Sequence, residues 1–463
     1  MKKIFLTIIF CFLVTTNWGF AESRLDFTLY KLESGQKGNT LLVIGGIQGD
    51  EPGGFNAASL LVTNYRIKKG NVWVVPNMNF HSIINRKRGV YGDMNRKFAF
   101  IKSNDPDYHS IKKIKKIITH EKVDLVINLH DGSGFYRPNY IDHLRNPRRW
   151  GQSVIIDQED INTKQFGNLG AISRYVVKQV NRYLYDDEHA YHVKNTRTRM
   201  GNKEMAKTLT YFAINNGKPA FGSEGSKTFP TYKRAYYLLR VLEAYMDYMG
   251  IKYERDFPLT ARGVYNVINS NLNILLYDNK IFLDIKNARN ILNYMPLKIN
   301  SDIAFKPSNP LIAIVNSGTI YQVFHGNRRM TRLVPEYLPY DWSTNGVLMK
   351  IDGHLKEVSF GEKIDITNDF LVVPQEEYRV NVIGFKKQGI TNESGITIFR
   401  KDIGKQFSVD KTSRIFRVEV YHGEKFTGMI LANFVQNPKI FSSSNLQKVS
   451  MLQKPSAEKI RPN

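Results

Sequence analysis

Short apolar runs alternate with longer helical patterns from residue 39 to about residue 250, and this alternation constrains the fold more than any other feature. The predicted strands cover residues 39–44, 71–76, 123–129 and 219–223, and the predicted helices cover residues 54–65, 108–120, 173–185 and 232–249. This order is typical of an α/β domain with a mainly parallel mixed sheet flanked by helices. Because ligands bind beyond the carboxyl ends of parallel strands, we expect functional side chains directly after these runs.

After about residue 255 the pattern changes to short alternating strands separated by turn residues such as Asn316-Ser317-Gly318 and Asp352-Gly353. We expect two small all-β domains there, at residues 256–340 and 341–437, the second an immunoglobulin-like β-sandwich. They would follow the α/β domain at residues 22–255 and precede a flexible tail at residues 438–463. The length of 463 residues, which exceeds one ordinary compact core, agrees with this division.

The first residues predict export. Two lysines precede an apolar run over residues 4–14, and Gly19-Phe20-Ala21 has the small-residue pattern of a cleavage site. We therefore expect a signal peptide at residues 1–21, cleaved after Ala21, and a periplasmic protein whose mature chain has no integral membrane segment. An uncleaved membrane anchor is the alternative, but the apolar run is shorter than the ~20 residues that a spanning helix needs.

Composition narrows the chemistry further. The only cysteine, Cys11, lies in the predicted signal peptide, so the mature chain is expected to contain neither disulfides nor thiolate metal sites. The formal net charge of +24 favours polyanionic partners. The chain has no nucleic-acid motif and is expected to be exported, so we predict no nucleic-acid partner. Two explanations of the charge stay open: contact with anionic envelope material, or a lysine-rich proteome.

Polar side chains with metal-ligand chemistry follow two of the predicted strands. Gln48 and Glu51 lie three residues apart on a turn that enters a helix, so both can face one point. Taken alone, Glu51 could equally serve to stabilise the N-terminus of the following helix, because its carboxylate complements the helix macrodipole. His130 directly follows the strand at residues 123–129 and adds an imidazole at the same edge. One histidine, one carboxylate and one neutral ligand suit a catalytic zinc ion with an open fourth position, and we predict one Zn²⁺ per chain.

A basic loop at residues 86–96 lies between these ligand segments. A solvated positive loop would explain it, but arginine presents a planar donor fork suited to a carboxylate, and Asp93 is placed to orient the Asn95-Arg96 pair. Glu224 follows the fourth strand. A carboxylate near zinc can take a proton from bound water and pass it to a leaving amine.

In this order, Gln48-x-x-Glu51, Asp93-Met94-Asn95-Arg96, His130 and Glu224 resemble the zinc carboxypeptidases of the carboxypeptidase A type, over about residues 39–250. Most members of that family carry His-x-x-Glu at the first motif. In its glutamine, its export signal and its two β-domains, the chain resembles more closely the peptidoglycan D,L-carboxypeptidases that determine cell shape in helical Gram-negative bacteria. That resemblance implies release of meso-diaminopimelate from the muramyl tripeptide L-Ala-γ-D-Glu-meso-diaminopimelate, which leaves a dipeptide. Muropeptides would be the substrate, and other cell-shape proteins are candidate partners.

The resemblance implies a role for each matching residue. Gln48, Glu51 and His130 would be the metal ligands, and Glu224 would be the general base and acid. The residues expected to contact substrate are Arg88, Arg86, Asn95, Arg96, Thr208, Thr210 and Trp150. One arginine would polarise the scissile carbonyl, at position 88 or, as the competing candidate, 86, and the Asn-Arg pair would hold the terminal carboxylate. The two threonines, in a strand-like segment, and the tryptophan would line the pocket; a buried structural role is the alternative for the tryptophan.

Two other functions fit parts of the sequence. The glutamine ligand is consistent with a peptidoglycan-binding scaffold with lost or weakened catalysis, although the otherwise complete set of residues argues against it. The same motif resembles amide hydrolases that act on N-acyl amino acids, such as aspartoacylase and succinylglutamate desuccinylase. Those enzymes are normally intracellular, whereas this chain is expected to be exported. The β-domains could recognise glycan or brace the cleft, and their sequence does not distinguish these roles.

Overall fold

The computed structural model describes residues 25–435, so the predicted signal peptide and the predicted tail from residue 438 lie outside the described residues. The chain divides into two compact units. Among the described residues, the first comprises residues 25–268 together with Pro310–Val315 and Phe324–Arg328, and the second comprises Asn269–Asn309, Asn316–Val323 and residues 329–435. Within residues 25–435, no helix is both long enough and apolar enough to cross a membrane.

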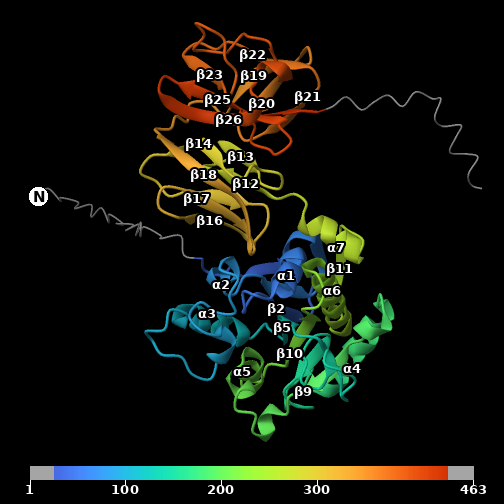
Figure 1. The fold of residues 1–463 in the computed structure, drawn as a ribbon. Helices are drawn as coiled ribbons and strands as arrows, with labels where there is room; N and C mark the ends of the chain where they lie inside the picture. Colours follow the sequence, from blue (N-terminus) through green and yellow to red (C-terminus); the bar gives the residue numbers. More distant parts are fainter. Residues whose placement is uncertain (1–24, 436–463) are drawn as a thin grey trace, which may run out of the picture. The chain divides into compact units, whose positions relative to one another are not determined.

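A seven-stranded mixed sheet forms the centre of the first unit (Figure 1). In spatial order its strands are β1 (Tyr30–Glu33), β4 (Asn71–Val75), β2 (Thr40–Ile44), β5 (Leu125–Gly132), β10 (Ala220–Ser226), β8 (Ser153–Ile156) and β9 (His192–Asn195). The four central strands β4, β2, β5 and β10 run parallel, whereas β1 and β8 pair antiparallel with β4 and β10. The central four are the strands predicted from the sequence, because parallel strands covered on both faces are continuous apolar runs.

Helices cover both faces of this sheet. Their bounds are α1 (Pro52–Asn64), α2 (Phe80–Ile84), α3 (Tyr108–Ile118), α4 (Leu169–Val180), α5 (Leu209–Asn215), α6 (Thr231–Tyr248) and α7 (Ala261–Ile268). Helices α1 and α4 pack against α6, and Figure 1 shows α3 and α5 on the opposite side of the sheet from α4 and α6. The short pairs β3 (Tyr65–Lys69) with β11 (Lys252–Arg255) and β6 (Phe135–Tyr136) with β7 (Arg145–Asn146) complete the unit.

The first unit is discontinuous in the sequence. It extends past residue 255 to Ile268 because α7 packs on α6. It also includes Pro310–Val315, whose Leu311 and Ala313 join an apolar cluster with three residues of the α1 and α2 segments, Phe55, Phe80 and Ile83. These later residues therefore form part of the core beside α1 and α2.

The described chain after Ile268 is all-β, as predicted. The first group of strands comprises β12 (Asn273–Leu276), β13 (Ile281–Asp284), β14 (Leu292–Lys298), β15 (Phe305–Pro307), β16 (Ile312–Asn316), β17 (Tyr321–His325) and β18 (Arg328–Leu338). They form a three-stranded sheet, β13-β12-β15, and a four-stranded sheet, β14-β18-β17-β16. In the second sheet β14 runs parallel to β18, an arrangement that the alternating sequence pattern does not reveal.

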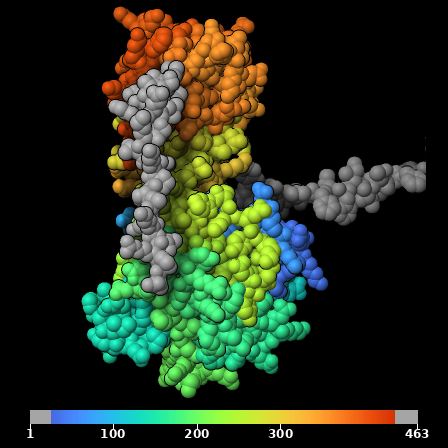
Figure 2. Space-filling view, turned by 90° about the vertical axis from the view of Figure 1, so that its right-hand side faces the viewer, coloured from blue at the N-terminus to red at the C-terminus, as the bar shows by residue number. Residues whose placement is uncertain are grey.

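Two four-stranded sheets form a sandwich over the last part of the described chain. Its strands are β19 (Gly346–Ile351), β20 (His354–Ser359), β21 (Lys363–Ile366), β22 (Asp369–Val372), β23 (Tyr378–Val382), β24 (Ile398–Phe399), β25 (Ile415–His422) and β26 (Lys425–Phe434). The sheet orders are β20-β19-β22-β24 and β21-β26-β25-β23. Apolar residues of both sheets share one core, and the earlier (orange) and later (red) strands lie beside each other in Figure 2.

Candidate metal centre and active-site cleft

Gln48, Glu51 and His130 converge at the carboxyl ends of β2 and β5. Gln48 Oε1 lies 3.1 Å, and Glu51 Oε2 2.8 Å, from His130 Nδ1. All three side chains are buried. An imidazole nitrogen, a carboxylate oxygen and an amide oxygen are all donor types found in metal sites. The three donor atoms thus fit one metal ion.

The loop after β2 brings Gln48 and Glu51 together because two glycines let it turn tightly. Gly46 has a φ of 73°, in the left-handed region that favours glycine. A Cβ on Gly49 would lie 2.1 Å from the backbone carbonyl carbon of Ser82. Glu51 immediately precedes α1 but makes no side-chain capping hydrogen bond. Its carboxylate instead faces His130 and accepts a hydrogen bond from the backbone N–H of Asp131 at 3.2 Å.

Asp93 orients the residues around this centre. Its two oxygens accept from Gln48 Nε2 at 2.9 and 3.0 Å, which turns the Gln48 carbonyl oxygen toward His130. Asp93 also accepts from Arg88 Nε and from the backbone N–H of Asn95, each at 2.9 Å. Burial pushes the pKa of Asp93 up, but the Gln48 hydrogen bond and the Arg88 charge outweigh it and hold the pKa below its ordinary value. The Gln48–Asp93 contact joins residues 45 apart, and no local sequence pattern predicts it.

Glu224 lies in β10, in register with His130 of β5. The side chain is buried, and its Oε2 has no hydrogen-bond partner among residues 25–435. Burial is the main reason that the pKa of Glu224 rises to about 8, and the carboxylates of Glu51 and Asp131 add to the rise. A buried carboxyl with a raised pKa, which a neighbouring metal cation would lower toward neutral, suits proton transfer to and from a reacting group.

A cleft of about 290 Å³ opens beside these groups. The residues predicted from the sequence that line it are Gln48, Glu51, Arg88, Asn95, Arg96, His130, Trp150, Thr208, Thr210 and Glu224. Arg86 is absent from this wall, because it has a φ of 55° and its Nε donates to Asn327 O at 2.8 Å. Arg88 Nη1 lies 3.4 Å from Glu51 Oε1, so of the two arginines only Arg88 reaches the centre.

Asn95 and Arg96 lie at a short helical turn that lines the cleft. Asn95 Oδ1 accepts from the backbone N–H of Leu209 at 3.0 Å, which leaves Nδ2 facing His130 Nε2 at 3.4 Å. Arg96 Nη1 donates to Asn95 O at 3.1 Å, and Arg96 Nε lies 3.8 Å from a carboxylate oxygen of Glu204. Both side chains therefore hold donor groups at the cleft.

The segment around Thr208 and Thr210 is the start of a helix, so the strand-like interpretation of it is wrong. Thr208 is the N-cap of α5: its hydroxyl accepts from Tyr211 N at 3.3 Å and also lies 3.2 Å from Thr210 Oγ1. This capping hydrogen bond satisfies a backbone N–H that a helix end leaves free. Trp150 is half-buried in the cleft wall, with the Lys194 ammonium 4.6 Å from its ring centroid.

Lys227 is a cleft residue that no motif indicated. Its Nζ donates to Asp50 Oδ2 at 2.9 Å and lies 3.7 Å from Glu51 Oε1. The sequence did hold one indication that Lys227 lines the cleft: it lies three residues after Glu224, directly after the end of β10. Lys227 adds a positive charge beside the buried carboxylates.

A family model for the catalytic part of carboxypeptidases controlling helical cell shape matches residues 1–269, more than half of the chain. The chain belongs to this family. A second family model, for the C-terminal domain of metallo-carboxypeptidases, matches residues 340–435 of the same chain. The chain is therefore a metallo-carboxypeptidase, and the family resemblance predicted from the sequence is confirmed.

Solved structures of the cell shape determinant Csd4 from Helicobacter pylori are similar to this carboxypeptidase. The apo structure is 39% identical, with a TM-score of 0.82 over 89% of this chain and 100% of that chain. The tripeptide-bound structure is 38% identical with the same TM-score and coverage. The mDAP-bound form, described as a D,L-carboxypeptidase, is 39% identical, with a TM-score of 0.83 over 88% of this chain and 100% of that one. These matches confirm the predicted fold class. No curated protein sequence matches the chain significantly.

The metallo-carboxypeptidase family implies a metal ion, and the convergent donors around His130 fit one. Within residues 25–435, no cluster of three or more His, Cys, Asp and Glu side chains is placed to hold a metal. Glu51 and His130 would hold the ion together with the Gln48 carbonyl oxygen, whose residue type such a cluster does not include.

Proposed function

We propose that this carboxypeptidase uses Zn²⁺ and releases meso-diaminopimelate from the muramyl tripeptide L-Ala-γ-D-Glu-meso-diaminopimelate in the periplasm. The convergence of Gln48 Oε1 and Glu51 Oε2 on His130 Nδ1, beside the unpartnered carboxyl of Glu224, carries the proposal. The Csd4 structures with bound tripeptide and mDAP support the substrate. The signal-like residues 1–21 support export.

The donor set can hold zinc, with one difference from a histidine-rich site. An amide oxygen is neutral, as imidazole is, so glutamine in place of histidine leaves the formal charge of the site unchanged. Zinc favours nitrogen over a neutral oxygen, which predicts weaker binding. The hydrogen bond from Gln48 Nε2 to Asp93 opposes this loss, because a negative acceptor polarises the amide and makes its oxygen a better donor to the metal. We therefore expect a weaker but functional site.

The roles of the chain's own residues follow from their positions. When bound, Zn²⁺ supplies Lewis-acid activation of water and of the scissile carbonyl. Glu224 takes the proton from the attacking water and delivers it to the leaving amine. Arg88, held by Asp93, offers its guanidinium to the carbonyl oxygen as negative charge develops there. Asn95 and Arg96 bind the terminal carboxylate and so align the bond to be cut.

Mass spectrometry of purified muropeptides incubated with the enzyme tests the proposal. The zinc-loaded protein should convert tripeptide to dipeptide with release of diaminopimelate, a chelator should stop the reaction, and added zinc should restore it. A Glu224→Gln variant serves as the control for contaminating peptidases. If the zinc-loaded protein binds muropeptides but leaves the tripeptide intact, the scaffold alternative replaces the proposed activity.

A further inference from the structure

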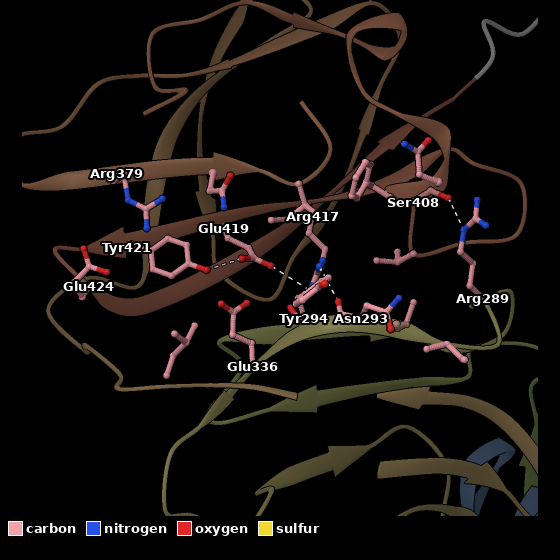
Figure 3. Close-up of a pocket in the computed structure, with 18 residues that line it drawn as sticks. Arg289, Asn293, Tyr294, Glu336, Arg379, Ser408, Arg417, Glu419, Tyr421 and Glu424 are labelled. Atoms are coloured by element: carbon pink, nitrogen blue, oxygen red, sulfur yellow. Dashed lines mark hydrogen bonds and ion pairs between the residues drawn. The ribbon is translucent and has the colours of Figure 1, made fainter. Parts of the chain in front are cut away.

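A second cavity, of about 540 Å³, lies within the second unit (Figure 3). Strands β14 and β18 contribute to one wall, β23 and β25 to the other, and residues 406–409 lie at one end. Its volume is within the range of about 300–1,000 Å³ that is usual for small-molecule sites. The two family matches end at residue 269 and resume at residue 340, so β14 and β18 belong to neither match.

Glu419 of β25 is the unusual group in this cavity. The residue is 2% exposed. One carboxylate oxygen, Oε2, accepts from the Tyr421 hydroxyl at 2.7 Å, whereas Oε1 has no hydrogen-bond partner among residues 25–435. A buried carboxylate oxygen without a donor is costly, because it has lost water and gained nothing in its place. A positively charged hydrogen-bond donor would stabilise Glu419 Oε1.

The neighbouring cation, Arg417, does not donate a hydrogen bond to Glu419 Oε1. Its Nη1 lies 3.3 Å from Glu419 Oε1 without hydrogen-bond geometry. Its guanidinium donates instead to the backbone oxygens of Tyr294, at 2.8 Å, and Asn293, at 3.1 Å. Tyr294 has a left-handed φ of 52°, a conformation that is strained for a side-chain-bearing residue. Arg417 is therefore committed to holding this bulged part of β14 at the cavity edge.

A second carboxylate makes this end of the cavity more strongly anionic. Glu336 of β18 is exposed, and in Figure 3 its carboxylate faces that of Glu419. Burial raises the pKa of Glu419, and the Glu336 charge adds to the rise, whereas Arg417 opposes it. An ammonium group between the two carboxylates would relieve their repulsion and supply the missing donor.

A free guanidinium lies beside these carboxylates. Arg379 of β23 lies 4.4 Å from the ring centroid of Tyr421, the residue whose hydroxyl holds Glu419. Within residues 25–435 the Arg379 guanidinium makes no hydrogen bond to another side chain or to the backbone, and Figure 3 shows it pointing toward the tyrosine ring. A guanidinium held flat on an aromatic ring keeps its donor edge available for a carboxylate.

We propose that this cavity binds the zwitterionic end group of an amino acid or peptide, with the ammonium between Glu419 and Glu336 and the carboxylate at Arg379. The site is separate from the residues that hold the metal. Diaminopimelate carries such a group at its free end in the tripeptide and at both ends once released; this choice of ligand rests on the proposed function. The cavity of the second unit would then hold one stem peptide or released product while the metal-site cleft cleaves a different peptide.

Calorimetric titration of the zinc-loaded, full-length protein with meso-diaminopimelate tests the proposal. Wild type should bind meso-diaminopimelate in two events, one at the metal cleft that releases it and one at this cavity. Glu419→Gln and Arg379→Met should each weaken the cavity event by about ten-fold or more, the effect of one lost charge-assisted hydrogen bond. Pimelate, which has the same carbon chain and carboxylates but no amines, should fail to bind this site. Glu357→Gln, an exposed glutamate of β20, is the matched control and should bind as wild type does.

Tripeptide cleavage is measured on the same samples and should be unchanged in all three variants. Binding that neither cavity variant weakens would overturn the inference, even if cleavage proceeds. Binding that both variants weaken, in a protein that does not cleave tripeptide, would support the inference and reject the proposed function. Arg379→Met changes a half-buried side chain at the edge of the sandwich, so it remains informative if Glu419→Gln fails to fold.

Discussion

Replacing Asp93 by asparagine should weaken zinc binding although Asp93 is not a ligand. Asparagine keeps one carbonyl oxygen but puts an NH₂ group at the position of Oδ2, which accepts from both Gln48 Nε2 and Arg88 Nε. Two donors would then face each other, and the Gln48 amide would turn to relieve the clash. Its NH₂ group would point at the metal in place of its oxygen, and an amide nitrogen that carries hydrogens is not a zinc ligand.

The size of this effect follows from the hydrogen bonds that change. A hydrogen bond to a charged acceptor contributes about 1.5–3 kcal/mol, and loss of a partner that orients a metal ligand typically costs about 10–100-fold in affinity. We therefore expect the zinc Kd of Asp93→Asn to rise by about 10–100-fold.

A competition titration against a chromophoric zinc chelator gives the Kd of Asp93→Asn. Asp105→Asn is the matched control, because Asp105 is paired with Lys97 at 2.8 Å in the neighbouring part of the chain and is not among the residues lining the cleft. Its Kd should equal that of wild type. An unchanged Kd in Asp93→Asn would refute the argument that Asp93 sets the orientation of Gln48.

Four further outcomes are expected. Gln48→Ala should lose zinc on dialysis while Gln48→His retains it, and full occupancy of the alanine variant by elemental analysis would exclude Gln48 as a ligand. Glu224→Gln should keep its zinc but lower kcat by ~10²-fold or more, because the proton shuttle is gone; near-normal turnover would contradict this role. Arg88→Ala should lower kcat/KM for tripeptide by about 10²-fold, as loss of an oxyanion donor does, whereas Arg86→Ala should not; equal losses would remove the distinction between them. Asp410 accepts hydrogen bonds from the backbone N–H groups of three nearby residues; burial raises its pKa, but these bonds and a threonine hydroxyl outweigh burial and hold the pKa below its ordinary value. A depressed folded-state pKa contributes stability above the unfolded value and loses it as pH falls through the folded value. Asp410→Asn should therefore lower Tm at pH 7, with a difference from wild type that shrinks below about pH 3.8; a difference that is the same at all pH values would contradict this account.

The central sheet could be predicted from sequence because burial on both faces leaves a continuous apolar run, as in β2 and β5. The edge strands β1 and β9 were not predicted. Their side chains are half-buried or exposed, so neither strand shows a continuous apolar run. The strand β8 is fully buried but only four residues long, too short to be distinguished from a loop segment.

The candidate site was predictable where its residues follow central strands. Gln48 follows β2, whereas His130 and Glu224 lie near the carboxyl ends of β5 and β10, and parallel strand ends necessarily meet at one edge of the sheet. The choice between Arg86 and Arg88 depends on a left-handed backbone angle at Arg86, which composition does not encode. The threonines at 208 and 210 have high β-propensity, but here a capping hydrogen bond starts a helix and outweighs that propensity.

The apolar cluster that joins Leu311 and Ala313 to Phe55, Phe80 and Ile83 limits how the gene can be divided. The two family matches suggest a catalytic module that ends near residue 269. A fragment cut there would expose the two phenylalanines and the isoleucine, each worth about 1.5–3 kcal/mol when fully buried. That loss is comparable with the whole stability of an ordinary domain, about 5–15 kcal/mol. The catalytic module therefore completes its core only with residues more than forty positions beyond this boundary, and a cut or a domain fusion at residue 269 should destabilise it.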